Sequence, residues 1–198
     1  MAVAIFGGTF DPVHLGHTHM VKTALEEFNL SELVIVPNAN PPHKKDSKIA
    51  DFSHRYNMLK LAFRDFKNVT VSDYEKDTSK FSYSVDTMRH FRSVYGEDTY
   101  FVIGADSLLS IECWHNYEAL LNENSFIVFH REGGGVLMET VERYRQKGCK
   151  IYLSDMPKFD VSSTMVRDAV KDGLNTDKLL CPEVFGYIRD NSLYGGRL

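Results

Sequence analysis

Two histidines near the start of the chain stand three residues apart, shortly after a pair of glycines. They are His14 and His17, and the glycines are Gly7 and Gly8. Glycines at a turn let the backbone approach a ligand without a Cβ in the way. Imidazole N–H groups can donate hydrogen bonds to phosphate oxygens, and the free N–H groups at a helix start also favour an anion. This spacing predicts a phosphate site at the first turn of the chain.

A second group of polar residues occurs near the C-terminus. Ser162, Ser163 and Thr164 precede a helical pattern, and Arg167 lies about one turn further along it. Hydroxyls at a helix start can bind phosphate oxygens, and a guanidinium one turn later can reach the same anion. The same hydroxyls are typical N-caps, which satisfy the first N–H groups of a helix. The residues alone leave phosphate binding and capping open.

The histidines permit other interpretations. Together with His19 they could form a metal site, but no cysteine or carboxylate stands at a suitable spacing, so we expect no metal ligands in the protein. Surface histidines without a role are another alternative, which the flanking glycines disfavour. A Walker phosphate loop needs Gly-Lys-Ser or Gly-Lys-Thr, and neither occurs; the dinucleotide fingerprint Gly-x-Gly-x-x-Gly is also missing.

The composition restricts the class of protein and its partners. The 198 residues carry a net charge of -4, which gives no general attraction to nucleic acid or to a membrane, so we expect neither partner. The three cysteines lie far apart, which argues against a disulfide framework or a structural zinc site. We recognise no signal peptide, and no apolar stretch reaches the ~18 residues of a membrane helix. We therefore expect a cytoplasmic protein, and a homo-oligomer is compatible with its sequence.

Short apolar runs alternate with amphipathic segments along the whole chain. The apolar runs predict strands over 3–6, 33–36, 69–71, 99–103, 126–129 and 150–153. Helical spacing predicts helices over 17–28, 53–66, 85–95 and 136–146, and a mostly helical tail from 163 onward. This alternation indicates an α/β, Rossmann-like fold: a doubly wound, mostly parallel sheet with helices on both faces. Such sheets bind ligands beyond the carboxyl ends of their strands, so the first turn is the expected site.

The first turn and the C-terminal group together resemble one known family. The turn reads Gly7-Gly8-Thr9-Phe10-Asp11-Pro12-Val13-His14-Leu15-Gly16-His17. It resembles the His-x-Gly-His signature of the nucleotidyltransferase superfamily, shared with class I aminoacyl-tRNA synthetases, and over its full length the nicotinate-nucleotide adenylyltransferase version. The later segment Ser162-Ser163-Thr164-Met165-Val166-Arg167 resembles the superfamily's ATP phosphate motif, with Val166 as a mild departure. The resemblance runs from Ile5 to about Tyr194 and implies a single nucleotidyltransferase domain over 1–198, with a small helical C-terminal portion at about 163–198.

The resemblance implies an enzyme that transfers the adenylyl group of ATP to nicotinic acid mononucleotide. The products would be nicotinic acid adenine dinucleotide and pyrophosphate, in NAD biosynthesis, and Mg²⁺ is the expected cofactor, bound with ATP. The implied catalytic residues are His14, His17 and Arg167. The implied ATP contacts are Gly8, Thr9, Phe10, His14, His17, Gly104, Asp106, Arg131, Ser162, Ser163, Thr164 and Arg167.

The middle of the chain is expected to bind the second substrate. By resemblance, the mononucleotide contacts are Asn40, Lys44, Ser84, Trp114 and His115. Trp114 would stack on the pyridine ring, although a lone tryptophan is also typical of a core. Ser84 would help to hold the nicotinate carboxylate, or cap a helix that starts at Val85, and both can be true together. His115 stands where relatives often have an aromatic residue, a departure that bears on the geometry of the ring pocket.

Two further assignments have alternatives. Asp106, which follows Gly104 at the end of a predicted strand, could accept hydrogen bonds from ribose hydroxyls of ATP or cap the next helix. Lys44, like Asn40, could meet the phosphate or ribose of the mononucleotide. Alternatively, Lys44 could form a solvated charge run on a loop with Lys45 and Lys48.

Other members of the superfamily are rival interpretations. Phosphopantetheine adenylyltransferase shares both phosphate motifs, but that family usually has Thr where His14 stands and lacks the Pro41-Pro42-His43-Lys44 loop. Cytidylyltransferases and a catalytically silent nucleotide-binding module are further alternatives. A tRNA-synthetase fragment does not fit, because the chain is short, acidic overall and without a Lys-Met-Ser-Lys-Ser loop.

Overall fold

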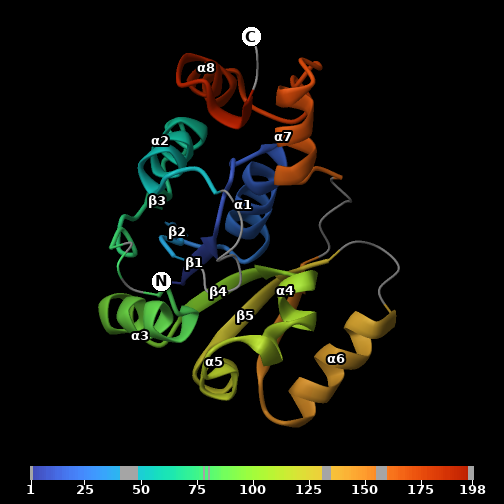
Figure 1. Ribbon diagram of the computed structural model, residues 1–198. Helices are drawn as coiled ribbons and strands as arrows, with labels where there is room; N and C mark the ends of the chain where they lie inside the picture. Colours follow the sequence, from blue (N-terminus) through green and yellow to red (C-terminus); the bar gives the residue numbers. More distant parts are fainter. Residues whose placement is uncertain are drawn as a thin grey trace.

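The computed structural model describes residues 2–40, 49–77, 79, 81–130, 135–154 and 160–195. The strands in this part of the chain are β1 (Val3–Gly8), β2 (Glu32–Pro37), β3 (Val69–Val71), β4 (Thr99–Gly104), β5 (Ser125–Phe129) and β6 (Lys150–Ser154). All six pair in parallel within one sheet, in the order β3-β2-β1-β4-β5-β6 (Figure 1). The chain order reverses between β1 and β4, which makes the gap beyond their carboxyl ends the topological switch point.

Eight helices connect and follow these strands within the described ranges. They are α1 (Leu15–Glu27), α2 (Phe52–Ala62), α3 (Ser84–Tyr95), α4 (Ala105–Leu109), α5 (Tyr117–Glu123), α6 (Gly135–Gln146), α7 (Ser163–Lys171) and α8 (Pro182–Asp190). Two short 3₁₀ turns, η2 (Ile111–Cys113) and η3 (Leu193–Gly195), complete the described elements. No helix in the described ranges combines the length and apolar character that crossing a bilayer requires.

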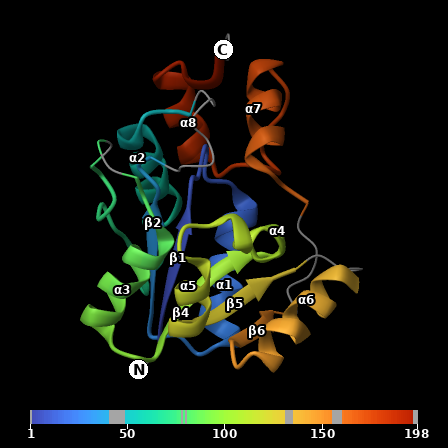
Figure 2. The same cartoon turned by 60° about the horizontal axis from the view of Figure 1, so that its bottom comes forward.

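The sheet separates two apolar cores, because successive side chains of a strand point to opposite faces. Val3 and Ile5 of β1 belong to a core completed by α3, α4, α5 and α6. Ala4 and Phe6 belong to a second core, completed by α1, α2, α7 and α8. Figure 1 shows these two groups of helices on opposite sides of the sheet, and Figure 2 shows α7 and α8 side by side at the end toward which β1 points. The predicted α/β fold with helices on both faces is confirmed, and the pairing observed is parallel throughout.

Five of the six predicted strands agree with the observed ones to within one residue at each end, because buried parallel strands are nearly continuous apolar runs. Strand β1 extends two residues beyond its predicted end, through Gly7 and Gly8. Helix α1 begins at Leu15 and not at the predicted residue 17, so His14 is its N-cap. Helix α2 ends at Ala62, several residues before the predicted end. Helices α4 and α5 were not predicted; they have five and seven residues, too few to show a clear helical period.

Candidate active site

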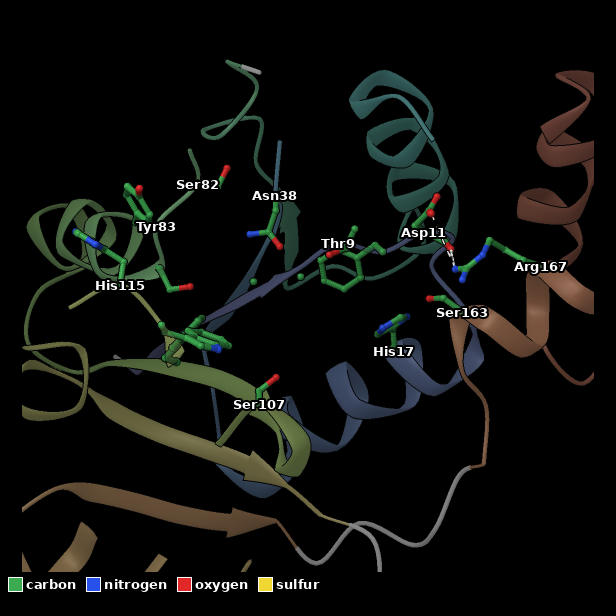
Figure 3. Close-up of a pocket in the computed structure, with 16 residues that line it drawn as sticks. Thr9, Asp11, His17, Asn38, Ser82, Tyr83, Ser107, His115, Ser163 and Arg167 are labelled. Atoms are coloured by element: carbon green, nitrogen blue, oxygen red, sulfur yellow. Dashed lines mark hydrogen bonds and ion pairs between the residues drawn. The ribbon is translucent and has the colours of Figure 1, made fainter. Parts of the chain in front are cut away.

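A cavity of about 350 Å³ lies at the switch point. Nine residues expected to bind substrate line it, namely Gly8, Thr9, Phe10, His17, Ser84, Trp114, His115, Ser163 and Arg167. Its other lining residues were not expected, and they are Gly7, Asp11, Asn38, Ser82, Tyr83, Phe101 and Ser107. Figure 3 shows His17, Ser163 and Arg167 at one end, which we call the phosphate end, and Tyr83 and His115 at the other. Tyr83 and His115, together with Trp114, make up what we call the aromatic end.

The segment 7–14, which we call the glycine turn, brings a phenylalanine ring against His17. Phe10 has a φ of 50°, in the left-handed region, and its buried ring folds back over Gly8. A Cβ on Gly8 would lie 2.9 Å from this ring, so any larger residue there would displace the ring. The Phe10 ring meets the His17 ring edge to face, with 4.9 Å between centroids. The turn therefore supports the imidazole of His17 from one side.

One hydrogen bond determines which nitrogen of His17 carries the proton. The backbone N–H of His14 donates to Nδ1 of His17 over 3.2 Å. Because a backbone N–H can only donate, Nδ1 is the accepting nitrogen and neutral His17 has its proton on Nε2. Burial, and then the nearby His14, lower the pKa of His17 well below 6.5. At neutral pH His17 thus lines the cavity as an uncharged hydrogen-bond donor.

His14 lies behind His17 and does not itself line the cavity. The two rings stack with 3.7 Å between centroids and 27° between planes. His14 is buried, and burial lowers its pKa to about 4. Its Nδ1 is buried without a hydrogen-bond partner among the described residues. Leaving such an atom unsatisfied costs about 1–3 kcal/mol.

The start of helix α1 offers fewer free N–H groups than the sequence led us to expect. The N–H of Leu15 donates to the carbonyl of Leu179 over 2.9 Å, and the N–H of His17 donates to the carbonyl of His14 over 2.9 Å. These groups are not available to an anion. The imidazole of His17 is therefore the main donor that this helix presents to the cavity.

Helix α7 joins the phosphate end from the far end of the chain. Ser163 Oγ donates to the carbonyl of Pro12 over 2.9 Å, and Arg167 Nη1 donates to the carbonyl of Asp11 over 2.7 Å. Arg167 Nη2 also donates to Thr164 Oγ1 over 3.1 Å. These contacts hold a hydroxyl and a guanidinium at the cavity wall, next to the glycine turn.

The two other hydroxyls of this group have different places. Ser162 Oγ accepts from the N–H of Met165 over 3.2 Å, so Ser162 is the N-cap of α7. Ser162 and Thr164 are not among the residues that line the cavity. For Ser162 the capping alternative is confirmed, and phosphate binding by these two residues stays a prediction.

The aromatic end consists of rings in contact with one another. The Tyr83 and His115 rings stack with 4.2 Å between centroids and 29° between planes. Trp114 meets Phe101 edge to face at 6.4 Å and packs against the core on the α3 side of the sheet. Trp114 is half-buried, so it serves both the core and the cavity. Such an end can receive a flat ring by stacking.

Helix α3 begins at this end, one residue earlier than expected. Its N-cap is Tyr83 and its first residue is Ser84, so the expectation that Ser84 caps a helix starting at Val85 is wrong. A helix start favours an anion, because its first N–H groups have no partner within the helix and the dipole is positive there. Ser84, the first residue of this helix, lines the cavity. A flat ring bearing a carboxylate fits these features.

Ser82 and Asn38 join the loop after β2 to the segment before α3. Ser82 Oγ accepts from the N–H groups of Ala39 (3.2 Å) and Asn40 (3.4 Å). The N–H of Asn38 donates to the carbonyl of Gly8 over 2.9 Å, and its side chain donates to Glu75 over 3.2 Å. Asn38 belongs to no recognised motif, whereas Ser82 begins the segment Ser82-Tyr83-Ser84-Val85-Asp86-Thr87, which resembles a family motif from which only Ser84 was expected to bind substrate. The available signal is that Asn38 follows the strand next to β1, where a parallel sheet brings its loops together.

Some predicted residues are not among those that line the cavity. Gly104 is the N-cap of α4 and Asp106 lies in its first turn, so the capping alternative for Asp106 is wrong. Ser107, one residue later, lines the cavity instead. Asn40 is also absent from the lining. Lys44 and Arg131, like the loop 41–48, lie outside the described residues.

Comparisons with known proteins place the chain in a nucleotidyltransferase family. Residues 5–169 match the family described as cytidylyltransferase-like. A Clostridium kluyveri protein named "probable nicotinate-nucleotide adenylyltransferase" is 39% identical over 198 residues, covering 96% of this chain and 98% of that protein. A Moorella thermoacetica protein with the same name is 40% identical over 201 residues, covering 99% of this chain and 93% of that protein.

A solved structure is similar in fold. The Plasmodium falciparum nicotinic acid mononucleotide adenylyltransferase complexed with NaAD has a TM-score of 0.83 to this chain at 23% identity. The match covers 99% of this chain and 98% of that one. At this level of identity the likeness concerns the fold alone.

Proposed function

Because this chain belongs to the cytidylyltransferase-like family, and within it to the nicotinate-nucleotide adenylyltransferases, we propose that the cavity at the switch point is its active site. The enzyme transfers the adenylyl group of ATP to nicotinic acid mononucleotide, giving nicotinic acid adenine dinucleotide and pyrophosphate in NAD biosynthesis. One observation carries the assignment of the site. The glycine turn and α7, more than 150 residues apart in sequence, meet at one end of a cavity whose other end is aromatic.

The reaction needs positioning more than it needs a protein nucleophile. A 5′-phosphate oxygen of the mononucleotide attacks the α-phosphorus of ATP in line, and the bond from that phosphorus to the bridging oxygen breaks as pyrophosphate leaves. The mononucleotide phosphate is already an anion at neutral pH, so no side chain has to remove a proton. Catalysis then comes from holding both substrates and from stabilising charge on the transferred group.

The residues of the phosphate end suit these tasks. His17 donates from Nε2 to an oxygen of the α-phosphate, with His14 stacked behind it as a second imidazole. Ser163 and Arg167 hold the departing pyrophosphate, Arg167 through its charge and planar fork. A donor fixed before the substrate arrives stabilises the transition state without reorganisation. Gly8, Thr9 and Phe10 would lie along the same polyphosphate.

The metal is proposed to arrive with ATP. No group of three or more His, Cys, Asp or Glu side chains suited to hold a metal occurs in the described ranges. Mg²⁺ keeps several waters and often binds through substrate phosphates, which fits a site with few protein ligands. When bound, it neutralises charge on the polyphosphate.

The two nucleoside ends are assigned from their surroundings. The pyridine ring stacks on Trp114 at the aromatic end, and its carboxylate meets Ser84 and the start of α3. Gly104 and Asp106 are proposed for the adenosine of ATP. Asn40, with Lys44 beyond the described residues, is proposed for the phosphate or ribose of the mononucleotide, and Arg131 for the polyphosphate. A cytoplasmic location and a homo-oligomer stay predictions.

The function is tested by pyrophosphate release with ATP and Mg²⁺ and three acceptors: nicotinic acid mononucleotide, nicotinamide mononucleotide and phosphopantetheine. We expect kcat/KM to favour the nicotinic acid form by about tenfold or more, equivalent to ~1.4 kcal/mol in the transition state. Activity with phosphopantetheine alone would keep the phosphate end and overturn the assignment of the aromatic end.

A further inference from the structure

The carboxylate of Asp11 lies beneath the phosphate end, in a buried position between distant chain segments. Asp11 is 6% exposed. Its Oδ1 accepts from the N–H of Ala50 over 3.1 Å and from the hydroxyl of Tyr194 over 2.8 Å. Its backbone carbonyl accepts from Arg167 Nη1 over 2.7 Å. One residue of the glycine turn therefore links α7, the segment just before α2 and the C-terminal η3.

A buried arginine holds the same turn from below. Arg55 is 1% exposed, and it donates from Nη1 to the carbonyl of Thr9 and from Nε to the carbonyl of Ala50, each over 2.8 Å. Burial lowers the pKa of Arg55, and the attraction of Asp11 opposes part of this lowering. Buried charges are tolerated when they are compensated and hydrogen-bonded, as this pair is.

The hydroxyl of Tyr194 is a dependable donor to Asp11. Burial, and then the charge of Asp11, raise the pKa of Tyr194, so its hydroxyl keeps its proton. Tyr194 has a φ of 61°, which is uncommon for a bulky residue. Its ring packs against the apolar core on the α1 side of the sheet, and η3 contacts α7. The contacts of the Tyr194 side chain therefore offset an unfavourable backbone conformation at this residue.

The hydrogen bond from Tyr194 to Asp11 matters for Arg167, because the Asp11 carboxylate lies close to that guanidinium. Asp11 Oδ2 lies 4.0 Å from Arg167 Nη1, at the outer limit of an ion pair, whereas Oδ1 is hydrogen-bonded to Tyr194 and Ala50. A carboxylate without the Tyr194 hydroxyl would gain by moving onto the guanidinium. Arg167 would then have its charge neutralised and its fork turned away from the cavity.

We propose that Tyr194 is a positioning residue for adenylyl transfer, because its hydroxyl holds the Asp11 carboxylate away from Arg167 and so leaves that guanidinium for the phosphates of ATP. The C-terminal segment thereby completes the phosphate end without touching substrate. This inference rests on the proposed function, in which Arg167 binds the pyrophosphate portion of ATP.

The test compares Tyr194→Phe with a matched control, Tyr187→Phe. Tyr187 lies in α8, and its hydroxyl bonds to His54 (3.0 Å) and Asn57 (3.2 Å) in α2, away from the glycine turn. Both variants lose one hydrogen-bonded, partly buried hydroxyl from the same part of the chain. We expect kcat/KM for ATP to fall about tenfold or more in Tyr194→Phe, with the KM for nicotinic acid mononucleotide within about twofold. In Tyr187→Phe both constants stay within about twofold.

A double variant separates positioning from general destabilisation. In the Arg167→Ala background, Tyr194→Phe should lower kcat/KM by less than about twofold, because it acts through the missing guanidinium. Unchanged kcat/KM for ATP in Tyr194→Phe, an equal loss in Tyr187→Phe, or a full tenfold loss without Arg167 would each overturn the inference. If the wild-type chain forms no dinucleotide, the proposed function fails. The inference is then tested separately, by calorimetric measurement of ATP binding to the wild type and to Tyr194→Phe. The Kd for ATP should then be about tenfold weaker in Tyr194→Phe, and equal values would overturn the inference.

Discussion

At the phosphate end of the cavity, His17, Ser163 and Arg167 are each fixed by a hydrogen bond to the backbone of the glycine turn. At the aromatic end, Trp114 and the Tyr83–His115 pair meet their neighbours through the faces and edges of rings. Directional bonds hold polar groups in place before a ligand arrives, whereas ring contacts are less directional and allow small shifts. From this difference we expect the phosphate end to determine the rate and the aromatic end to determine which acceptor binds.

The largest expected effect is at His17. In His17→Ala, kcat should fall ~10²–10³-fold, because a fixed donor to the transferred phosphate is lost. The measurement is steady-state turnover with both substrates saturating, alongside thermal unfolding to verify the fold. His19→Ala, two residues further along the same helix, is the matched control and should keep its turnover. Near-normal kcat in His17→Ala would contradict the role of the phosphate end.

A smaller loss is expected in Arg167→Lys. The charge remains, but lysine lacks the planar fork that reaches Asp11 and Thr164 at once. We expect kcat/KM for ATP to fall about 10- to 100-fold while the KM for the mononucleotide is unchanged. Initial rates over a grid of both substrate concentrations give the two constants separately. A change confined to the KM for the mononucleotide would contradict the assignment of Arg167 to the ATP phosphates.

Acidification should weaken the fold through the stacked imidazoles. His14 has a folded pKa of about 4 against an ordinary 6.5, and that of His17 is also lowered. Between these values the unfolded chain binds more protons than the folded one, so the free energy of unfolding falls as pH drops through this window. For His14 alone the loss between pH 7 and pH 5 is about 2 kcal/mol, measurable by urea denaturation. His14→Asn should show a smaller loss, and an equal loss would contradict a buried neutral ring.

The smallest effect concerns the aromatic end. Trp114→Ala should raise the KM for nicotinic acid mononucleotide about three- to tenfold, since stacking contributes about 0.5–1.5 kcal/mol, and should leave kcat nearly unchanged. Trp114→Phe retains a ring and should lie between this variant and the wild type. A loss in kcat as large as that of His17→Ala would remove the distinction between the two ends.

The phosphate end could be predicted from the sequence, because its residues occur in two contiguous motifs. Asp11 stands inside one of them, yet its partners Ala50 and Tyr194 come from 39 and 183 residues away, and no local pattern reveals such contacts. Asn38 was missed for the same reason, and Ser82, although it lies two residues before Ser84, was not expected at the cavity. The order of the strands brings them to the cavity, and the sequence indicates a parallel sheet without giving that order.

The fold itself was predictable where elements are long and apolar. Buried strands such as β5 appear as apolar runs, and α1 shows a clear helical period. The start of α3 was misplaced by one residue, which changed the role of Ser84 from cap to first residue. Helix ends depend on tertiary contacts that a single sequence does not display.

A crystal structure with bound nicotinic acid adenine dinucleotide tests most directly that one cavity serves both substrates. The phosphates of the product should lie against His17 at the phosphate end, and its pyridine ring should stack on Trp114 at the aromatic end. A pyridine ring bound elsewhere, or phosphates held away from His17, would contradict the division of the cavity into a phosphate end and an aromatic end.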